Sequence, residues 1–145
     1  MKISTKGRYA LRMLVYLADH RNNGYISLKE ISGKEQLSRK YMEQIIPVLT
    51  KAGILKANRG PQGGYMLTGS PENYTVGQIL RLTEGSLSPV ECASQNPVEC
   101  ERSTDCPTLI IWQGLYKVIN EYLDGITLQD ILDKQRENYA NDYVI

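Results

Sequence analysis

Two short helical segments followed directly by a turn-rich, basic hairpin constrain this chain more than any other feature. Ser27-Leu28-Lys29-Glu30 is a capping box that predicts a helix starting near Leu28, and a second helix is expected to open at Leu37 and Ser38. Residues 54–58 and 65–67 then predict two strands around Arg59-Gly60-Pro61-Gln62-Gly63-Gly64. This order predicts a winged helix-turn-helix in a chain that is mainly α with one small β-hairpin.

Apolar periodicity predicts the other helices. We expect helices over residues 8–20, from Thr75 to about Glu84, from Pro107 onward, and a short one after Thr127. Pro47 lies inside the second helix of the winged unit and is expected to kink or shorten it, because proline removes an internal hydrogen bond. The inward-facing set of that helix is predicted to be Tyr41, Met42, Ile45, Val48 and Leu49.

These segments predict three units. Residues 1–84 are expected to form a winged helix-turn-helix DNA-binding domain, and residues 85–106, which show no periodicity, a cysteine-containing sensor loop. Residues 107–145 are expected to hold a long dimerisation helix, a C-terminal helix and a polar tail without an assigned role. A chain of 145 residues suits one such domain with an oligomerisation arm.

The charges of this chain are divided between its two halves. Residues 1–60 carry 12 Lys and Arg against 4 Asp and Glu, whereas residues 61–145 carry 5 against 12, within a formal net charge of +1. A basic half of this kind indicates a polyanionic partner, here double-stranded DNA. The acidic half is expected to face away from it.

Several classes of protein are excluded by what the sequence lacks. No run of 18 apolar residues is present, and the first residues lack an apolar signal region, so we expect a cytoplasmic protein without a membrane partner. The chain has one histidine, no nucleophile–base motif and no phosphate-binding glycine loop after a strand. We therefore expect that it is not an enzyme.

The second helix and the hairpin tip carry the side chains expected to contact DNA. A recognition helix places its N-terminal residues against base edges in the major groove, where Gln pairs with adenine and Glu accepts from cytosine. An Arg at a glycine-rich tip is suited to the minor groove, and N-terminal cations are suited to phosphates. The predicted contacts are Lys2, Lys6, Arg8, Ser38, Arg39, Lys40, Glu43, Gln44, Arg59 and Gly60, with Arg12 as a further phosphate contact.

An alternative is a winged-helix module that binds a protein and not DNA. The affinity of a DNA-binding module falls steeply with salt concentration, because only DNA binding releases condensed counterions, and this distinguishes it from the protein-binding module.

The helix expected after Pro107 carries an apolar seam with heptad spacing, and Ile110, Ile111 and Leu115 add a second apolar flank. Because a small chain has difficulty covering so apolar a helix internally, the seam predicts a symmetric homodimer. The alternative is that the helix packs on its own domain. The residues of the seam are Leu109, Trp112, Tyr116, Ile119 and Leu123.

All three cysteines fall within fifteen residues, as Cys92-x7-Cys100-x5-Cys106. An odd number of cysteines without a signal peptide argues against a disulfide framework. Their clustering indicates a metal or cluster site, or a redox sensor.

Two longer motifs carry a family resemblance. Lys2-Ile3-Ser4-Thr5-Lys6-Gly7-Arg8-Tyr9-Ala10 and Arg59-Gly60-Pro61-Gln62-Gly63-Gly64-Tyr65 resemble the Rrf-type bacterial transcription regulators, and the resemblance extends over nearly the whole chain. It implies a repressor or dual regulator that binds a near-palindromic operator as a homodimer and controls iron–sulfur or cysteine and sulfur metabolism. It also implies that Glu43, Gln44 and Arg59 contact DNA. The segment 84–91 and the tyrosine-containing tail look closest to the cysteine-metabolism branch.

The cysteine loop is similar to the loop that holds an iron–sulfur cluster, with [2Fe–2S] favoured, in the sensing branches of this family. The resemblance implies Cys92, Cys100 and Cys106 as ligands, but the positions of the family's fourth ligands are Leu109 and Arg8 here. The carboxylates that remain for this role are Glu91, Glu99, Glu101 and Asp105.

Three interpretations of the loop stay open. The first is a cluster with an unidentified fourth ligand, and the second is a thiol or disulfide redox switch without metal. The third is inert thiols, with regulation through a protein partner such as cysteine synthase.

Overall fold

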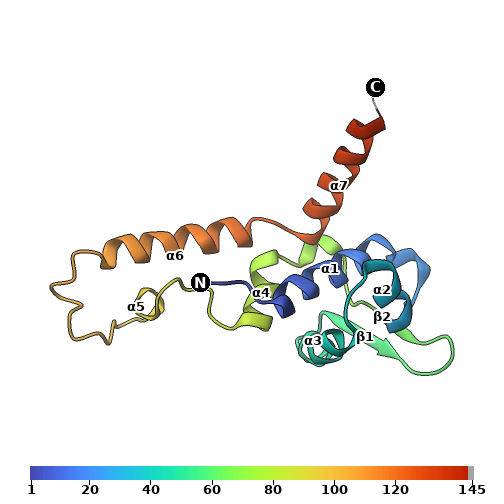
Figure 1. The fold of residues 1–145 in the computed structure, drawn as a ribbon, viewed down its shortest axis with the longest axis horizontal. Helices are drawn as coiled ribbons and strands as arrows, with labels where there is room; N and C mark the ends of the chain where they lie inside the picture. The colour runs from blue at the N-terminus through green and yellow to red at the C-terminus, as the bar shows by residue number, and fades with distance from the viewer. Residues whose placement is uncertain (144–145) are drawn as a thin grey trace.

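The computed structural model describes residues 1–143, so residues 144–145 of the predicted tail lie outside the described part of the chain. Helices α1–α4 and a two-stranded hairpin gather into one body, from which α6 extends as an arm and α7 projects separately (Figure 1). The elements are α1 Thr5–Asp19, η1 Arg21–Asn23, α2 Leu28–Glu35, α3 Arg39–Lys51, β1 Leu55–Asn58, β2 Gly64–Leu67, η2 Pro71–Asn73, α4 Val76–Glu84, α5 Glu91–Ser94, α6 Leu109–Asp124 and α7 Leu128–Tyr143.

The predicted capping boxes set the starts of the helices. The Ser27 hydroxyl accepts the Glu30 N–H at 3.1 Å, and the Thr75 hydroxyl accepts the Gln78 N–H at 3.1 Å. α1 begins at Thr5, earlier than expected, because the Ser4 hydroxyl caps it by accepting the Gly7 N–H at 3.3 Å. The predicted fold class, mainly α with one winged-helix hairpin, is confirmed by these elements.

The structure differs from the sequence-based expectation at Pro47. Helix α3 continues through Pro47 to Lys51 and is not shortened there. Proline costs α3 one internal hydrogen bond, but Ile46 and Leu49 on either side are buried in the core. Packing of this apolar face therefore holds the last turn of α3 in place.

The hairpin is antiparallel, with Leu55 opposite Leu67 and Asn58 opposite Gly64. The chain before α2 adds one further bridge, because Ile26 N–H donates to the Tyr65 carbonyl at 2.9 Å and Tyr65 N–H donates back at 2.8 Å. Gly64 allows this approach: it has φ of 157°, and a Cβ there would lie 2.2 Å from the Ile26 carbonyl oxygen. Gly64 is therefore required by backbone packing.

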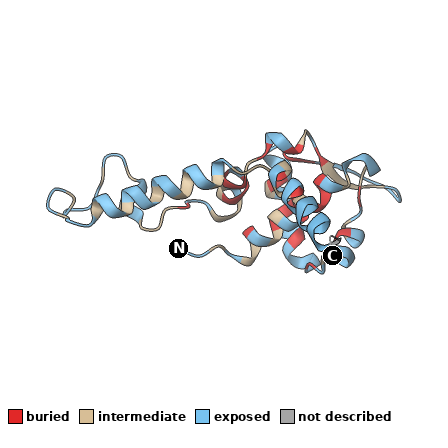
Figure 2. Cartoon of the chain, turned by 90° about the horizontal axis from the view of Figure 1, so that it is seen from above, coloured by how far each residue is buried: buried red, intermediate tan, exposed pale blue. Residues whose placement is uncertain are grey.

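The principal core lies within the winged-helix body, where the buried residues concentrate (Figure 2). α1 contributes the largest share, including Met13, Leu14 and Leu17. The start of α7 joins this core through Leu128 and Leu132, so the last helix is anchored to the winged-helix body although the sequence places it after the dimerisation helix. α7 also continues to Tyr143, through most of the segment expected to be a polar tail.

A smaller core joins α4 to the arm. Val76, Leu80 and Leu87 are buried there, and Ile119 and Leu123 of α6 pack against them. None of the 16 residues of α6 is fully buried. The arm is therefore attached to the body mainly at its C-terminal end.

Candidate DNA-binding surface and cysteine loop

The N-terminal half of α3 presents a polar face to solvent and an apolar face to the core. Met42, Ile45 and Leu49 are buried, which fixes the rotation of the helix about its axis. All predicted recognition residues are consequently exposed. They are Ser38, Arg39, Lys40, Glu43 and Gln44.

Tyr41 lies on the exposed side of α3, although the sequence pattern placed it in the apolar set. Its side chain is 39% exposed, and its ring meets the Tyr9 ring of α1 edge to face, with centroids 5.6 Å apart. This contact brings the N-terminal half of α1 beside the start of α3. Sequence reasoning missed Tyr9 and Tyr41 as part of this surface, because periodicity does not distinguish a core tyrosine from one at the rim.

The wing, defined here as β1, residues 59–63 and β2, holds Arg59 and Gly60 exposed at its tip. A backbone hydrogen bond from Gly63 N–H to the Gly60 carbonyl, at 2.9 Å, closes the tip. A surface groove is lined on one side by Pro47, Thr50 and Lys51 of α3 and on the other by Asn58 and Arg59. The groove therefore lies between the C-terminal half of α3 and the wing, and the predicted recognition residues on the N-terminal half of α3 do not line it.

The basic residues near the N-terminus divide into two groups. Lys2 and Arg8 are exposed and Lys6 is half-buried, which leaves their charges accessible to phosphates. Arg12 instead donates a hydrogen bond to the Glu35 carbonyl at the end of α2, and lies 3.6 Å from the Glu35 carboxylate. Arg12, expected as a phosphate contact, thus links α1 to α2 in this structure.

The three cysteines are free thiols that the structure does not bring into one ligand set. Cys92 and Cys100 border a common hollow with Glu91, Gln95 and Glu99, whereas Cys106 is outside the lining of that hollow. Within residues 1–143, no group of three or more His, Cys, Asp or Glu side chains has an arrangement that could hold a metal ion. As placed, these residues do not fit an iron–sulfur cluster.

Cys106 lies immediately before the start of α6. The Thr108 hydroxyl, 3.5 Å from the Cys106 sulfur, together with the backbone N–H groups of Thr108 and Leu109 and the charge of Arg102, lowers the pKa of the Cys106 thiol. Sequence reasoning did not single out Thr108, although Thr two residues after a cysteine at a helix start was a readable signal.

The two apolar stripes of α6 face different surroundings. The predicted seam residues are half-buried within their own chain, and two of them, Ile119 and Leu123, contact the smaller core. The predicted flank is exposed, and Val118 at 60% and Tyr122 at 67% exposure extend it along α6. In this exposed stripe, Ile111, Leu115, Val118 and Tyr122 repeat the 4-3-4 heptad spacing.

Within residues 1–143, no helix combines the length and the apolar character that crossing a lipid bilayer requires.

Comparison with known proteins decides the family. The family model described as "Rrf2: Iron-dependent Transcriptional regulator" matches residues 3–134. The chain belongs to the Rrf2 family. It is accordingly a DNA-binding transcriptional regulator and not an enzyme, and the sequence resemblance is confirmed.

The relatives of this chain include two named transcriptional regulators. The transcriptional regulator CymR of Bacillus subtilis is 38% identical over 143 residues, covering 96% of this chain and 97% of the relative. The regulator IscR of Aliivibrio salmonicida is 34% identical over 132 residues, covering 91% and 77%.

Solved structures that carry the same two names are also similar to this chain. B. subtilis CymR, described as the global cysteine regulator, has a TM-score of 0.77 at 37% identity, covering 92% of this chain and 98% of that one. T. potens IscR has a TM-score of 0.76 at 40% identity, covering 95% and 90%. Family and fold are thus established.

Proposed function

We propose that this Rrf2-family regulator acts as a homodimeric repressor on a near-palindromic operator, with cysteine or sulfur metabolism as the controlled process. The observation that carries the proposal is the exposure of Glu43 and Gln44 on the N-terminal half of α3 and of Arg59 at the tip of the wing. Glu43 and Gln44 are the residue types that accept from cytosine and pair with adenine in the major groove. Arg59 at the wing tip suits the minor groove.

The dimer would form through the exposed stripe of α6. Four large side chains at heptad spacing, Ile111, Leu115, Val118 and Tyr122, have no cover in their own chain within the described residues. A second copy of α6 covers such a stripe symmetrically, because an isologous interface repeats the same patch on both subunits. This proposal moves the predicted interface from the seam to the flank of the same helix.

The choice of sulfur metabolism rests on two observations. The relative B. subtilis CymR, whose solved structure is described as that of the global cysteine regulator, is 38% identical over 96% of this chain. In addition, the three thiols do not converge on one ligand set. We therefore assign no step of regulation to a cluster, and propose that the loop responds through its thiols or through a protein partner.

Replacing Arg59 by alanine tests the DNA-binding surface. The probe is a duplex selected from random sequence by the wild-type protein. Loss of a minor-groove arginine is expected to weaken binding roughly tenfold or more and to relax the preference for A·T pairs beneath the wing. It should also reduce the salt slope, which is the slope of the logarithm of the binding constant against the logarithm of salt concentration, by about 1.

Arg136→Ala is the matched control for Arg59→Ala. Arg136 lies on α7 in the acidic half of the chain, in an exposed ion pair with Asp19 at 3.8 Å. Its removal is expected to leave sequence preference and salt slope unchanged. An Arg59→Ala protein with wild-type sequence preference would show that the wing does not contact the operator.

A visible absorption spectrum tests the cluster-free proposal. Protein purified anaerobically and then supplied with iron and sulfide is expected to stay colourless, because its thiols do not form a ligand set. Sulfur-to-iron charge-transfer bands that disappear in a variant with all three cysteines replaced by alanine would contradict this proposal. They would place the chain in the iron–sulfur branch.

A further inference from the structure

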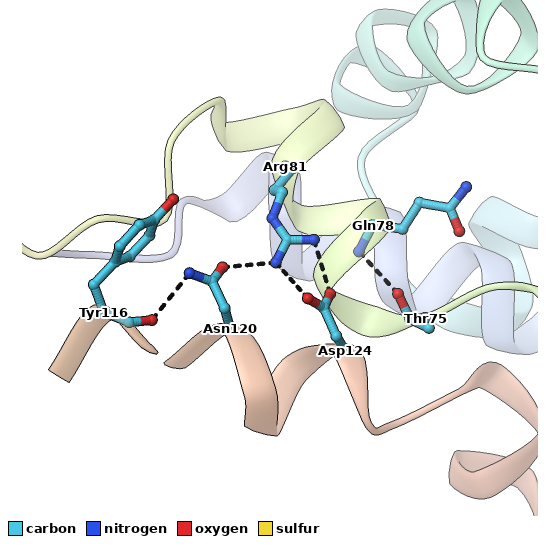
Figure 3. A network of polar contacts seen from close by, with 6 residues as sticks. All are labelled: Thr75, Gln78, Arg81, Tyr116, Asn120 and Asp124. Carbon is cyan, nitrogen blue, oxygen red and sulfur yellow. Dashed lines mark hydrogen bonds and ion pairs between the residues drawn. The ribbon is translucent and has the colours of Figure 1, made fainter. Parts of the chain in front are cut away.

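Arg81 of α4 holds the C-terminal end of α6 by a fork of hydrogen bonds (Figure 3). Its guanidinium donates to both carboxylate oxygens of Asp124, each at 2.8 Å, and to the Asn120 side-chain oxygen at 2.6 Å. Asn120 in turn donates to the Tyr116 carbonyl at 3.0 Å. Because a guanidinium is planar and rigid, a bidentate pair fixes the angle between its partners as well as their distance.

The fit of Asp124 against α4 is also steric. Gly77 lies one turn before Arg81, and a Cβ at Gly77 would lie 2.0 Å from the Asp124 carboxylate. Asp124 therefore rests on bare backbone of α4 while Arg81 holds it from the side. Ile119 and Leu123 bury apolar surface nearby, but contacts of that kind are not directional and do not fix the angle of α6 by themselves.

The next turn of α4 is tied to the start of α1. The Glu84 carboxylate accepts the Ser4 N–H at 3.1 Å and the Ser4 hydroxyl at 2.6 Å. α1 then meets α3 through the Tyr9–Tyr41 ring contact. A chain of direct contacts thus runs from α6 through α4 and α1 to the recognition helix.

Because α6 is long, a small change in its angle to the winged-helix body moves its far end by a large distance. At 1.5 Å per residue its 16 residues span about 24 Å, and the helix extends away from the body (Figure 1). A change of about 10° at the Arg81 end would move the far end of a helix of that length by about 4 Å. One base-pair step of DNA is about 3.4 Å, so a shift of this size is enough to misplace one recognition helix.

We propose that Arg81, with Asp124 and Asn120, is a positioning residue that fixes the angle of the dimer helix on the winged-helix body and so sets the half-site spacing that the regulator accepts. The proposal rests on the proposed function, a dimer formed through α6. Arg81 and Asp124 are 38% and 45% exposed, so their ion pair contributes little to the stability of the fold. Its effect is expected in geometry, and not in folding.

The test is Arg81→Lys, which keeps the charge but removes the fork, with Asp124→Asn as a second variant. The DNA affinity of each variant is measured on three kinds of duplex. The first has the half-site spacing selected by the wild-type protein, the second has one base pair added to or removed from that spacing, and the third carries a single half-site. We expect the preference for the selected spacing to fall roughly tenfold. Single half-site affinity, dimer mass and urea unfolding are expected to change little.

Lys117→Met is the matched control, since it removes an exposed ion pair with Glu121, at 3.8 Å, from the same helix. It should keep the spacing preference. The positioning role is overturned, and the proposed function is not, if the Arg81 and Asp124 variants keep the spacing preference. The same follows if they lose affinity for a single half-site as much as for the duplex with two half-sites. Wild-type protein that binds one half-site as tightly as two overturns the proposed dimeric function and the positioning role with it.

Discussion

Val118→Asp is expected to convert the regulator to a monomer and to weaken operator binding by about a hundredfold or more. Val118 is 60% exposed in the middle of the α6 stripe, so the change should not disturb the fold of the single chain. In the dimer it would bury one unpaired carboxylate from each subunit, which is costly in an apolar interface. Once the subunits separate, each winged-helix body binds its half-site without the benefit of linkage.

Sedimentation at micromolar concentration measures the first effect, as a change from twice 16.4 kDa to 16.4 kDa. Gln113→Asp is the matched control, because it adds one carboxylate to the exposed polar side of the same helix. It should remain dimeric and keep wild-type operator affinity. If Val118→Asp dimerises as the wild type does, the exposed stripe of α6 is not the interface.

Gly64→Ala is expected to destabilise the fold by roughly 2–4 kcal/mol. Gly64 has a positive φ of 157°, and a Cβ would lie 2.2 Å from the Ile26 carbonyl oxygen and 2.8 Å from the Ser27 nitrogen. Both neighbours are backbone, so relief requires separating the wing from the segment before α2. Urea unfolding measures the stability, and operator affinity should fall as well because the wing carries Arg59.

Alanine substitutions at two other glycines are controls for the stability change in Gly64→Ala. Gly33 lies in α2 with open space around its Cβ position, so Gly33→Ala should stabilise the fold by about 0.5–1 kcal/mol. Gly60 has φ of 115° and open space, so Gly60→Ala should show only backbone strain, of about 1 kcal/mol or more. If Gly64→Ala were no worse than Gly60→Ala, the close approach at Ile26 would not constrain the wing.

Local chemistry explains why much of the fold was predictable. A capping box is a contact between residues three apart, so Ser27 and Thr75 identify helix starts without tertiary information. The sequence did not predict α5 or the full length of α7, because no local pattern marks them. Residues 133–142 of α7 are exposed, and they include the Lys134–Glu137 ion pair at 3.6 Å, so this part of the helix buries no apolar stripe that periodicity could detect.

The DNA-binding surface was predictable in composition and less so in arrangement. Exposure of Glu43, Gln44 and Arg59 agrees with the prediction, although their contacts with DNA stay a prediction. The role of Arg12 could not be predicted from the sequence, because its pairing with Glu35 depends on how α1 and α2 are placed relative to each other. Tyr41 shows the same, since its edge contact with Tyr9 requires α1 and α3 to be already placed.

The sequence by itself determined the family, the winged-helix order and the division of charge near residue 60, because motifs, caps and composition are properties of neighbouring residues. Tertiary structure decided which apolar stripe of α6 is free, and that the three cysteines do not form one ligand set within residues 1–143. Both stripes have heptad spacing, so only the packing of Ile119 and Leu123 on α4 shows which one the chain covers itself. The Arg81–Asp124 contact joins residues 43 positions apart, a separation at which local sequence pattern carries no information on geometry.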